Sequence, residues 1–298
     1  MKRTPTAIRV IGVMGNVRKR DVLAVCRKIL AWCKRRSIRA IVEKDLLERL
    51  RLSDREARAY RGDVKQSDLI LTLGGDGFLF SAARHLYPCS VPLLHVNLGS
   101  LGYNAQATAD EMFRLLDEMR QHPLECQERL ILQGELWRGR KRLQRFYALN
   151  DIVVQKSTES RIIHLVLSID GQFVNEYRAD GLIVSTPTGS TAYNLAAGGP
   201  VLHPGVEAIV IAALCPHSIS NRAVLVPPTS LMEIQFRKHK DREDAVVSVD
   251  CQEWHALKPD DRVRICRAPQ KMRLVVNPNL SYFRVLHEKL GWGEPLDV

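Results

Sequence analysis

The chain has 298 residues, of which 45% are hydrophobic and 26% charged, and its formal net charge is +11. This length and composition are ordinary for a folded protein of two domains, and they exclude a disordered chain. No apolar run approaches the roughly 20 residues of a membrane-spanning helix, and the apolar part of residues 1–16 is too short for a secretory signal. We therefore expect a cytoplasmic protein without a membrane partner.

Two basic runs concentrate the positive charge, CKRRS at 33–37 and WRGRKR at 137–142. We interpret the first as a helix end, where cations complement the helix dipole, and the second as a hairpin turn in solvent. No DNA- or RNA-binding motif accompanies them, so we predict no nucleic-acid partner.

The first 120 residues alternate short apolar runs with amphipathic segments. Strands are expected at 7–16, 38–43, 68–73 and 92–97, and helical spacing of apolar residues appears over 22–33 and 108–121. In the latter segment, Thr108 and Glu111 have the spacing of a capping box. Strands separated by helices form parallel sheets, so we predict an α/β domain with a parallel sheet over residues 1–120.

The pattern changes near residue 130 to alternating apolar and polar residues with frequent turns. Asp170-Gly171 is a strong hairpin signal between two strand-like runs, and residues 281–292 have the pattern of a final helix. We therefore predict a mainly β domain over residues 121–276.

Asp76 lies among glycines in the motif GGDG at 74–77, directly after an expected strand, and we expect a helix to begin at Phe78. At the C-terminal end of a strand in an open α/β sheet, such glycines turn backbone N–H groups toward a ligand and form a phosphate cradle with the following helix. Asp76 would there orient a hydroxyl, accept its proton, or hold Mg²⁺ through water. The alternative is a plain turn, because glycine and aspartate are common turn residues.

Two further stretches follow expected strands. NLGSLGY at 97–103 is expected to face the same crevice as GGDG. The run RADGLIVSTPTGSTAYNLAAGGP at 178–200 clusters hydroxyl side chains around Tyr193, which has the ring needed to stack on a base. The alternative for this run is a polar surface loop with a helix that begins at Thr191.

Taken together, these motifs resemble the NAD kinase family. The matching segments are GGDG at 74–77, NLGSLGY at 97–103, Asn150-Asp151, ADGLIVSTPTGSTAYNLAAGGP at 179–200, CPHSISNR at 215–222, DCQ at 250–252 and LGWG at 290–293. They follow the family's order over nearly the whole chain. GGDG alone is shared with diacylglycerol and sphingosine kinases, whereas STPTGSTAY together with the Asn-acidic pair is specific to NAD kinases.

The resemblance implies transfer of a phosphoryl group from ATP, or in some members from polyphosphate, to the 2′-hydroxyl of the adenosine ribose of NAD. A divalent metal, Mg²⁺ or Mn²⁺, would accompany the donor, and no side chain is assigned as its ligand. The family fold is an α/β N-terminal domain and a β-rich, NAD-binding C-terminal domain with the site between them. Residues 277–298 would pack back on the first domain, and the protein would be a homodimer or homotetramer.

The resemblance also assigns residues. Asp76 would be the base or orienter near the 2′-hydroxyl, and Gly77 would line that position. Asn150 and Asp151 would hold the adenine and ribose region of NAD, and Asp180 would contact the nicotinamide end. Thr191 and Ala192 would contact the adenine, and Tyr193 would stack near it. The other positions assigned to ligand contact are Arg161, Arg178, Asn194, Ala196 and Gln252.

Three residues depart from the family pattern. Phe78 stands where a small polar residue such as threonine is usual, Asp151 is shorter than the usual glutamate, and Cys251 replaces a usual glycine or serine. These departures leave the choice of donor and the rate open. Two alternative functions follow: a lipid kinase that uses the same GGDG loop, and a non-catalytic NADP(H)-binding sensor in which Phe78 blocks the donor.

Overall fold

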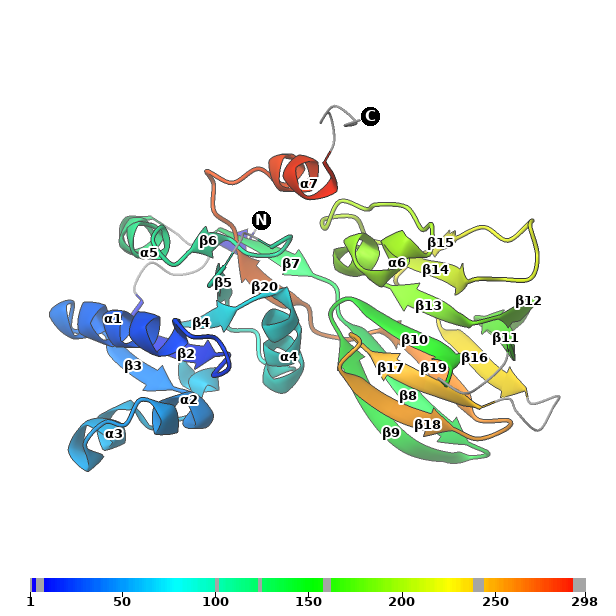
Figure 1. Cartoon of the computed structure of the whole chain (residues 1–298), viewed down its shortest axis with the longest axis horizontal. Helices are drawn as coiled ribbons and strands as arrows, with labels where there is room; N and C mark the ends of the chain where they lie inside the picture. Colours follow the sequence, from blue (N-terminus) through cyan, green and yellow to red (C-terminus); the bar gives the residue numbers. More distant parts are fainter. Residues whose placement is uncertain are drawn as a thin grey trace. The chain divides into compact units, whose positions relative to one another are not determined.

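A computed structural model describes residues 2–3, 8–99, 102–122, 125–157, 162–237 and 244–291. The described residues form two compact units (Figure 1). The first unit holds those up to Glu128 and from Met272 onward, and the second unit holds Arg129 to Lys271. The predicted ligand residue Arg161 lies outside the described residues.

One mostly parallel sheet organises the first unit, as predicted. Strands β2, β3, β4 and β5 pair in parallel, and β20 is parallel to β5, whereas β1 is antiparallel to β7. The order across the sheet is β1 (Lys2–Arg3), β7 (Glu125–Arg129), β20 (Met272–Val275), β5 (Leu93–Asn97), β4 (Leu69–Gly74), β2 (Val10–Gly15) and β3 (Arg39–Val42), with the short β6 (Ala107–Thr108) beside β5.

The helices of the first unit are α1 (Val22–Arg35), α2 (Lys44–Arg49), α3 (Asp54–Tyr60), α4 (Asp76–Leu86), α5 (Met112–Gln121) and α7 (Tyr282–Leu290), with the 3-10 turn η1 (Val64–Gln66). Helix α1 carries part of the basic run 33–37 in its last turn, as expected. The capping-box bonds also form, because the Thr108 backbone N–H donates to Glu111 Oε2 over 3.0 Å and the Thr108 hydroxyl accepts from the Glu111 backbone N–H over 3.4 Å. Helix α5 nevertheless begins at Met112, four residues after the start of the predicted range, and Glu111 is its N-cap.

Alternation along β4 separates two faces of the sheet. Leu69, Leu71 and Leu73 join the same buried cluster as the apolar faces of α1 and α5. Because successive strand residues point to opposite faces, Thr72 points to the other face, where it is fully buried. Helix α4 follows β4 directly and begins at Asp76, two residues before the predicted start at Phe78. Asp76 is thus the first residue of the helix, and Gly75 is its N-cap.

The division between the units differs from the boundaries that we drew near residues 120 and 276. Strands β7 and β20 belong to the sheet of the first unit, although both fall within the range predicted for the β-rich domain. In Figure 1 β20, drawn in orange-brown, enters this sheet beside the green and teal strands. The backbone N–H of Val276 also donates to Glu125 O over 2.9 Å. The sequence therefore predicted β structure over this range but not the sheet that the two strands join, because a short strand read alone carries no signal for its partner.

The second unit is a pair of antiparallel sheets, in agreement with the predicted β character. One is ordered β15 (Val224–Val226), β14 (Ile209–Leu214), β13 (Gly181–Ser185), β10 (Asp151–Lys156), β17 (Ala245–Val249) and β18 (Glu253–Leu257). The other is ordered β12 (Gln172–Ala179), β11 (Ile163–Ile169), β16 (Met232–Arg237), β19 (Arg262–Arg267), β8 (Leu132–Arg138) and β9 (Lys141–Ala148). Side chains from both sheets share one buried cluster, so the sheets pack face to face.

The predicted turns of this unit are confirmed. Asp170 and Gly171, with φ of 51° and 80°, join β11 to β12 as a two-residue hairpin. The basic run 137–142 turns between β8 and β9 through Gly139, whose φ is 57°.

A helical segment covers part of the outer face of the β10 sheet. The 3-10 turn η2 (Thr188–Thr191) leads into the short helix α6 (Tyr193–Ala196). Ala197 packs there against Val153, Ile183 and Leu214, which point away from the sandwich core. The helix therefore begins at Tyr193, two residues after the start considered from the sequence. Within the described ranges, no helix combines the length and apolarity needed to cross a membrane.

Candidate active site

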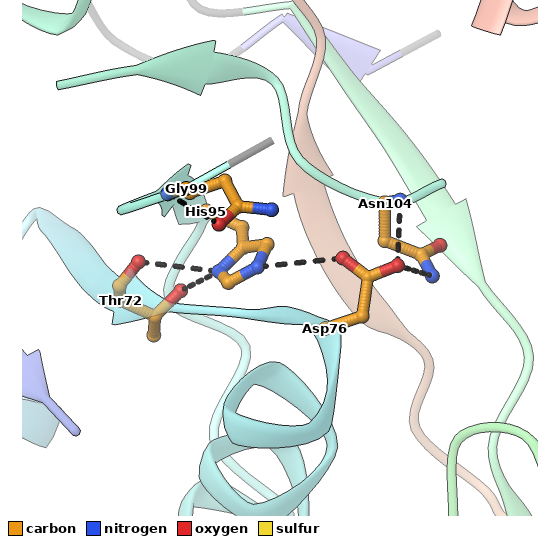
Figure 2. A network of polar contacts seen from close by, with 6 residues as sticks. Thr72, Asp76, His95, Gly99 and Asn104 are labelled. Carbon is orange, nitrogen blue, oxygen red and sulfur yellow. Dashed lines mark hydrogen bonds and ion pairs between the residues drawn. The ribbon is translucent and has the colours of Figure 1, made fainter. Parts of the chain in front are cut away.

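The first unit places Asp76 at the start of α4 with both carboxylate oxygens oriented (Figure 2). Oδ2 accepts long hydrogen bonds from Asn104, over 3.3 Å from the backbone N–H and 3.4 Å from the side-chain amide. Oδ1 is buried, lies 3.6 Å from His95 Nε2, and accepts no hydrogen bond from the described residues. The Asp76 side chain is 21% exposed. With Oδ1 buried, a ligand reaches the carboxylate at Oδ2.

His95 lies directly beside Thr72 in the sheet, because the two residues are partners in the β4–β5 register. The imidazole is fully buried. Its Nδ1 lies 3.0 Å from the Thr72 hydroxyl and 3.2 Å from the Thr72 carbonyl oxygen, while Nε2 faces Asp76 (Figure 2). Thr72, His95 and Asp76 therefore form a continuous polar row on the face of the sheet opposite the main cluster.

The two glycine-rich loops meet at Asp76, as the sequence predicted. A Cβ placed on Gly102 would overlap the Asp76 carboxylate, so only glycine allows this approach without movement. Burial and the nearby Asp76 charge raise the pKa of Tyr103. Ser100 and Leu101, in the middle of this loop, lie outside the described residues.

In the second unit, Asn150 and Asp151 begin β10, and the Asp250 carboxylate holds their backbone. It accepts hydrogen bonds from three consecutive backbone N–H groups, those of Leu149, Asn150 and Asp151, over 3.2, 2.8 and 3.2 Å. Asp250 itself adopts a positive φ of 49°. The strand end and its two polar side chains are thereby fixed in one orientation.

The side chains of Asn150 and Asp151 are buried yet incompletely bonded. The Oδ1 atom of each is buried without a hydrogen-bond partner among the described residues. Burial, and secondarily the charge of Asp250, raise the pKa of the Asp151 carboxyl from 3.8 to about 7. Buried polar atoms without partners are rare in folded proteins, and with a strongly shifted pKa they are typical of ligand sites.

The hydroxyl run at 185–191 serves mainly to shape its own backbone. Thr186 donates to Leu149 O over 2.6 Å and accepts from the Gly189 N–H over 3.1 Å. Ser190 donates to Pro187 O over 2.7 Å and accepts from the Leu202 N–H over 2.9 Å. The run is therefore neither a polar surface loop nor a row of free hydroxyls, because Ser185, Thr186, Thr188 and Ser190 are buried.

The structure brings several of the other predicted residues close to this pair. Tyr193 is 36% exposed, and its pKa is raised by burial first and then by Cys251, Cys215, Asp180 and Asp151, in that order. Thr191 and Ala192, just before it, are partly exposed. Asn194 is fully buried, and its amide donates to the carbonyls of Ser190 and Pro200, each over 3.3 Å. This side chain therefore stabilises the turn between Ser190 and Pro200.

Four other predicted residues lie at the edges of the region. Asp180 forms an ion pair with Lys156 over 2.8 Å, at the far end of β10 from Asp151. Arg178, Ala196 and Gln252 are exposed. Gly77, in the first turn of α4, is also exposed.

Sequence reasoning gave no role to four polar residues that support these sites, namely Thr72, His95, Asn104 and Asp250, although Asp250 falls in the matching segment DCQ. A histidine inside the apolar run PLLHVN was the available signal, because an ionisable side chain in a buried strand needs a partner. The partner itself was not readable, because it depends on the register of β5 against β4.

The comparisons with known proteins agree with these motifs. The model of the ATP-NAD kinase N-terminal domain matches residues 11–123, and that of the ATP-NAD kinase C-terminal domain matches residues 149–277. The chain belongs to the NAD kinase family.

Individual relatives match over most of the chain. The NAD kinase of Syntrophotalea carbinolica is 38% identical over 95% of this chain and 99% of its own length. The NAD kinase of Koribacter versatilis is 43% identical over 76% and 79%, respectively. Membership gives this kinase NAD and ATP as its substrates, and favours neither the lipid kinase nor the sensor.

Solved structures share the fold. Yeast NADH kinase, crystallised with NADH, superposes with a TM-score of 0.87 at 23% identity and covers 96% of this chain and 88% of its own. An NAD kinase from Archaeoglobus fulgidus, crystallised with ATP, gives a TM-score of 0.71 at 22% identity, with coverage of 95% and 98%. The expected fold of an α/β unit and a β-rich unit is thereby confirmed.

Proposed function

We propose that Asp76 is the catalytic carboxylate of this NAD kinase and that it receives the proton of the 2′-hydroxyl on the adenosine ribose. The observation that carries the proposal is the orientation of its carboxylate, with Oδ1 buried against His95 and Oδ2 toward Asn104. A 2′-hydroxyl is a poor nucleophile, so catalysis depends on holding it in line with the terminal phosphate while a base directs its proton. Gly77 would leave room for the ribose at that point.

The bond changes balance without further reactants. The 2′-oxygen forms a bond to the γ-phosphorus of ATP, and the bond from that phosphorus to the β,γ-bridging oxygen breaks to release ADP. The hydroxyl proton passes to Asp76 Oδ2 and then to solvent.

In the second unit, Asn150 and Asp151 would bind the adenine and ribose region of NAD. Their buried and unpartnered Oδ1 atoms support this role, because a ribose hydroxyl or an adenine amino group would satisfy them. Thr191 and Ala192 would contact the adenine, and Tyr193 would stack near it. Asp180 would contact the nicotinamide end, with Arg178, Ala196, Gln252 and Arg161 as further contacts, and Asn194 would act indirectly by holding the turn.

A divalent metal, Mg²⁺ or Mn²⁺, would be carried by the phosphates of the donor. The described residues contain no group of three His, Cys, Asp or Glu side chains placed to hold such an ion. Asp76 offers one carboxylate, which fits the habit of Mg²⁺ to keep several waters and bind one or two carboxylates plus substrate phosphates. When bound, the metal would neutralise charge on the transferring phosphoryl group. Polyphosphate as a second donor, the homodimer or homotetramer, and the cytoplasmic location stay predictions.

The test compares wild-type protein with Asp76→Asn in NADP formation from NAD, Mg²⁺ and either ATP or polyphosphate. Asparagine is nearly isosteric but accepts a proton poorly, so turnover should fall by roughly 100-fold or more while NAD affinity is largely kept. The matched control is Asp45→Asn, an exposed carboxylate in the first turn of α2. Wild-type turnover in Asp76→Asn would refute the role of Asp76, and removal of the metal with EDTA should abolish activity in every variant.

A further inference from the structure

In the row formed by Thr72, His95 and Asp76, two buried polar atoms face each other. Asp76 Oδ1 and His95 Nε2 are both buried, lie 3.6 Å apart, and have no hydrogen-bond partner among the described residues. The other ring nitrogen is well placed, because Nδ1 lies 3.0 Å from the Thr72 hydroxyl and 3.2 Å from the Thr72 carbonyl oxygen. The contacts at Nδ1 therefore decide whether Nε2, the ring nitrogen that faces Asp76, carries the ring proton.

Two arrangements of the imidazole protons are possible. If the Thr72 hydroxyl donates to Nδ1, the ring proton is on Nε2 and points at Asp76 Oδ1. If Nδ1–H instead donates to the Thr72 carbonyl, the Nε2 lone pair faces a carboxylate oxygen inside the protein. Two buried acceptors that face each other repel, so this second arrangement is disfavoured. The contact with Asp76 therefore favours the tautomer in which Nε2 carries the proton.

We propose that His95 is a positioning residue for the phosphoryl transfer, with Thr72 fixing its tautomer so that Nε2–H holds Asp76 Oδ1. The inference rests on the proposed role of Asp76. With Oδ1 held by His95 and Oδ2 approached by Asn104, the carboxylate keeps one rotamer, and its reactive oxygen is Oδ2. A small rotation would turn Oδ2 away from the hydroxyl, and small errors of placement reduce rates strongly.

The sequence supports a built arrangement over a chance contact. Thr72 and His95 are fully buried neighbours on β4 and β5. Asp76 follows Thr72 in the same chain segment and is the first residue of α4. A buried imidazole in a parallel sheet is costly unless it is hydrogen-bonded, whereas leucine or valine would fill the space without that cost. The histidine therefore serves Asp76 more than it serves the packing of the sheet.

The main test uses Thr72→Val, which keeps the shape of the side chain and removes the hydroxyl, with Thr72→Ser as the matched control that keeps it. Thr72→Val should lower kcat roughly tenfold with KM for NAD within about twofold, and Thr72→Ser should restore most of the loss. His95→Gln, whose amide N–H can reach toward Oδ1, should retain more activity than His95→Leu. If His95→Leu fails to fold, the threonine pair decides the question alone.

Two further readouts separate positioning from a purely structural effect. Nitrogen-15 NMR of the His95 ring should show a proton on Nε2 in wild-type protein and in Thr72→Ser, and a changed signal in Thr72→Val. The loss caused by Thr72→Val should also shrink in an Asp76→Asn background, because there is no longer a base to position.

The outcomes distinguish the two proposals. If Asp76→Asn keeps wild-type turnover, the role of Asp76 fails and this inference fails with it. If Asp76→Asn is inactive while folded Thr72→Val and His95→Leu both keep wild-type kcat, the role of Asp76 stands and only the positioning role of His95 is overturned. A loss from Thr72→Val that is equally large in the Asp76→Asn background would also overturn it.

Discussion

Asp151 is a carboxyl group whose ionised form is disfavoured in the folded protein. It is buried at the start of β10, its Oδ1 atom is unpartnered among the described residues, and Asp250 lies nearby. These conditions raise its pKa to about 7, against about 3.9 for an aspartate in an unfolded chain. Between these two values the folded protein binds a proton that the unfolded chain releases.

The sign of the resulting pH effect follows from that difference. Because the folded state binds more protons, the contribution of Asp151 to the free energy of unfolding should fall as pH rises from about 4 to about 7. Asp151→Asn removes the titration, so the variant should gain stability relative to wild type at pH 8 and little at pH 4. Urea unfolding at the two pH values measures this, with the exposed Asp45→Asn as control. Equal differences at both pH values would contradict the shifted pKa.

At the residue scale, the sequence predicted Asp76 but missed the group that faces it. Asp76 stands out because glycines surround it, and glycine is a local signal. His95 lies in a strand-like run whose apolar neighbours predict burial only. The contact arises from the pairing of Thr72 with His95 across two parallel strands. Register between strands is a non-local property, so no pattern within either run contains it.

At the element scale, the loop before β6 approaches α4 through Gly102. A Cβ at this position would overlap the Asp76 carboxylate, which is the end of a side chain and can rotate away. We therefore expect Gly102→Ala to lower kcat roughly 10- to 100-fold with little change in melting temperature. Gly99→Ala in the same loop is the control, because the nearest atom to its Cβ is 3.8 Å away. Unchanged kcat in Gly102→Ala would show that the loop does not constrain Asp76.

Gly189 makes a different kind of close approach. A Cβ there would meet the backbone carbonyl of Asn150, and a backbone cannot rotate away as a side chain does. Gly189→Ala should therefore reduce stability by about 1–3 kcal/mol and also weaken NAD binding, because Asn150 and Asp151 would shift together. Calorimetry and a binding titration on the same sample test both effects. Weaker binding at unchanged stability would contradict this cause.

The elements that the sequence predicted correctly are those with local signals. The strands β2, β4 and β5, the helices α1 and α5, and the hairpin at Asp170-Gly171 each follow from periodicity or turn chemistry within one segment. The start of α4 was misplaced because Gly75 and Gly77 resemble a turn, whereas Gly75 is the N-cap. The alternative of a polar surface loop for the hydroxyl run fails for a related reason, since its hydrogen bonds to Leu149 and Leu202 come from distant segments.

At the scale of the whole molecule, the first unit is discontinuous and the second is continuous. Strand β20 lies between β7 and β5, so β7 and β1 join the rest of this sheet only through residues 272–275. Asn277 ties the same segment to the loop before β6, because its backbone N–H and its amide bond Gln106 over 3.0 and 2.9 Å. The second unit has its own buried cluster from both sheets and needs no other segment for it.

This asymmetry predicts how fragments behave. Residues 129–271 expressed alone should give a β-type circular dichroism spectrum and one cooperative thermal transition, because the core shared by the two sheets is complete. Residues 1–128 alone should lack a cooperative transition, because β7 and β1 lose the strand that joins them to β5. Fusing residues 272–298 to residue 128 through a short glycine linker should restore the transition, since Val276 N–H already meets Glu125 O over 2.9 Å. A cooperative transition in residues 1–128 without the added segment would show that the first unit folds without β20, and would contradict this prediction.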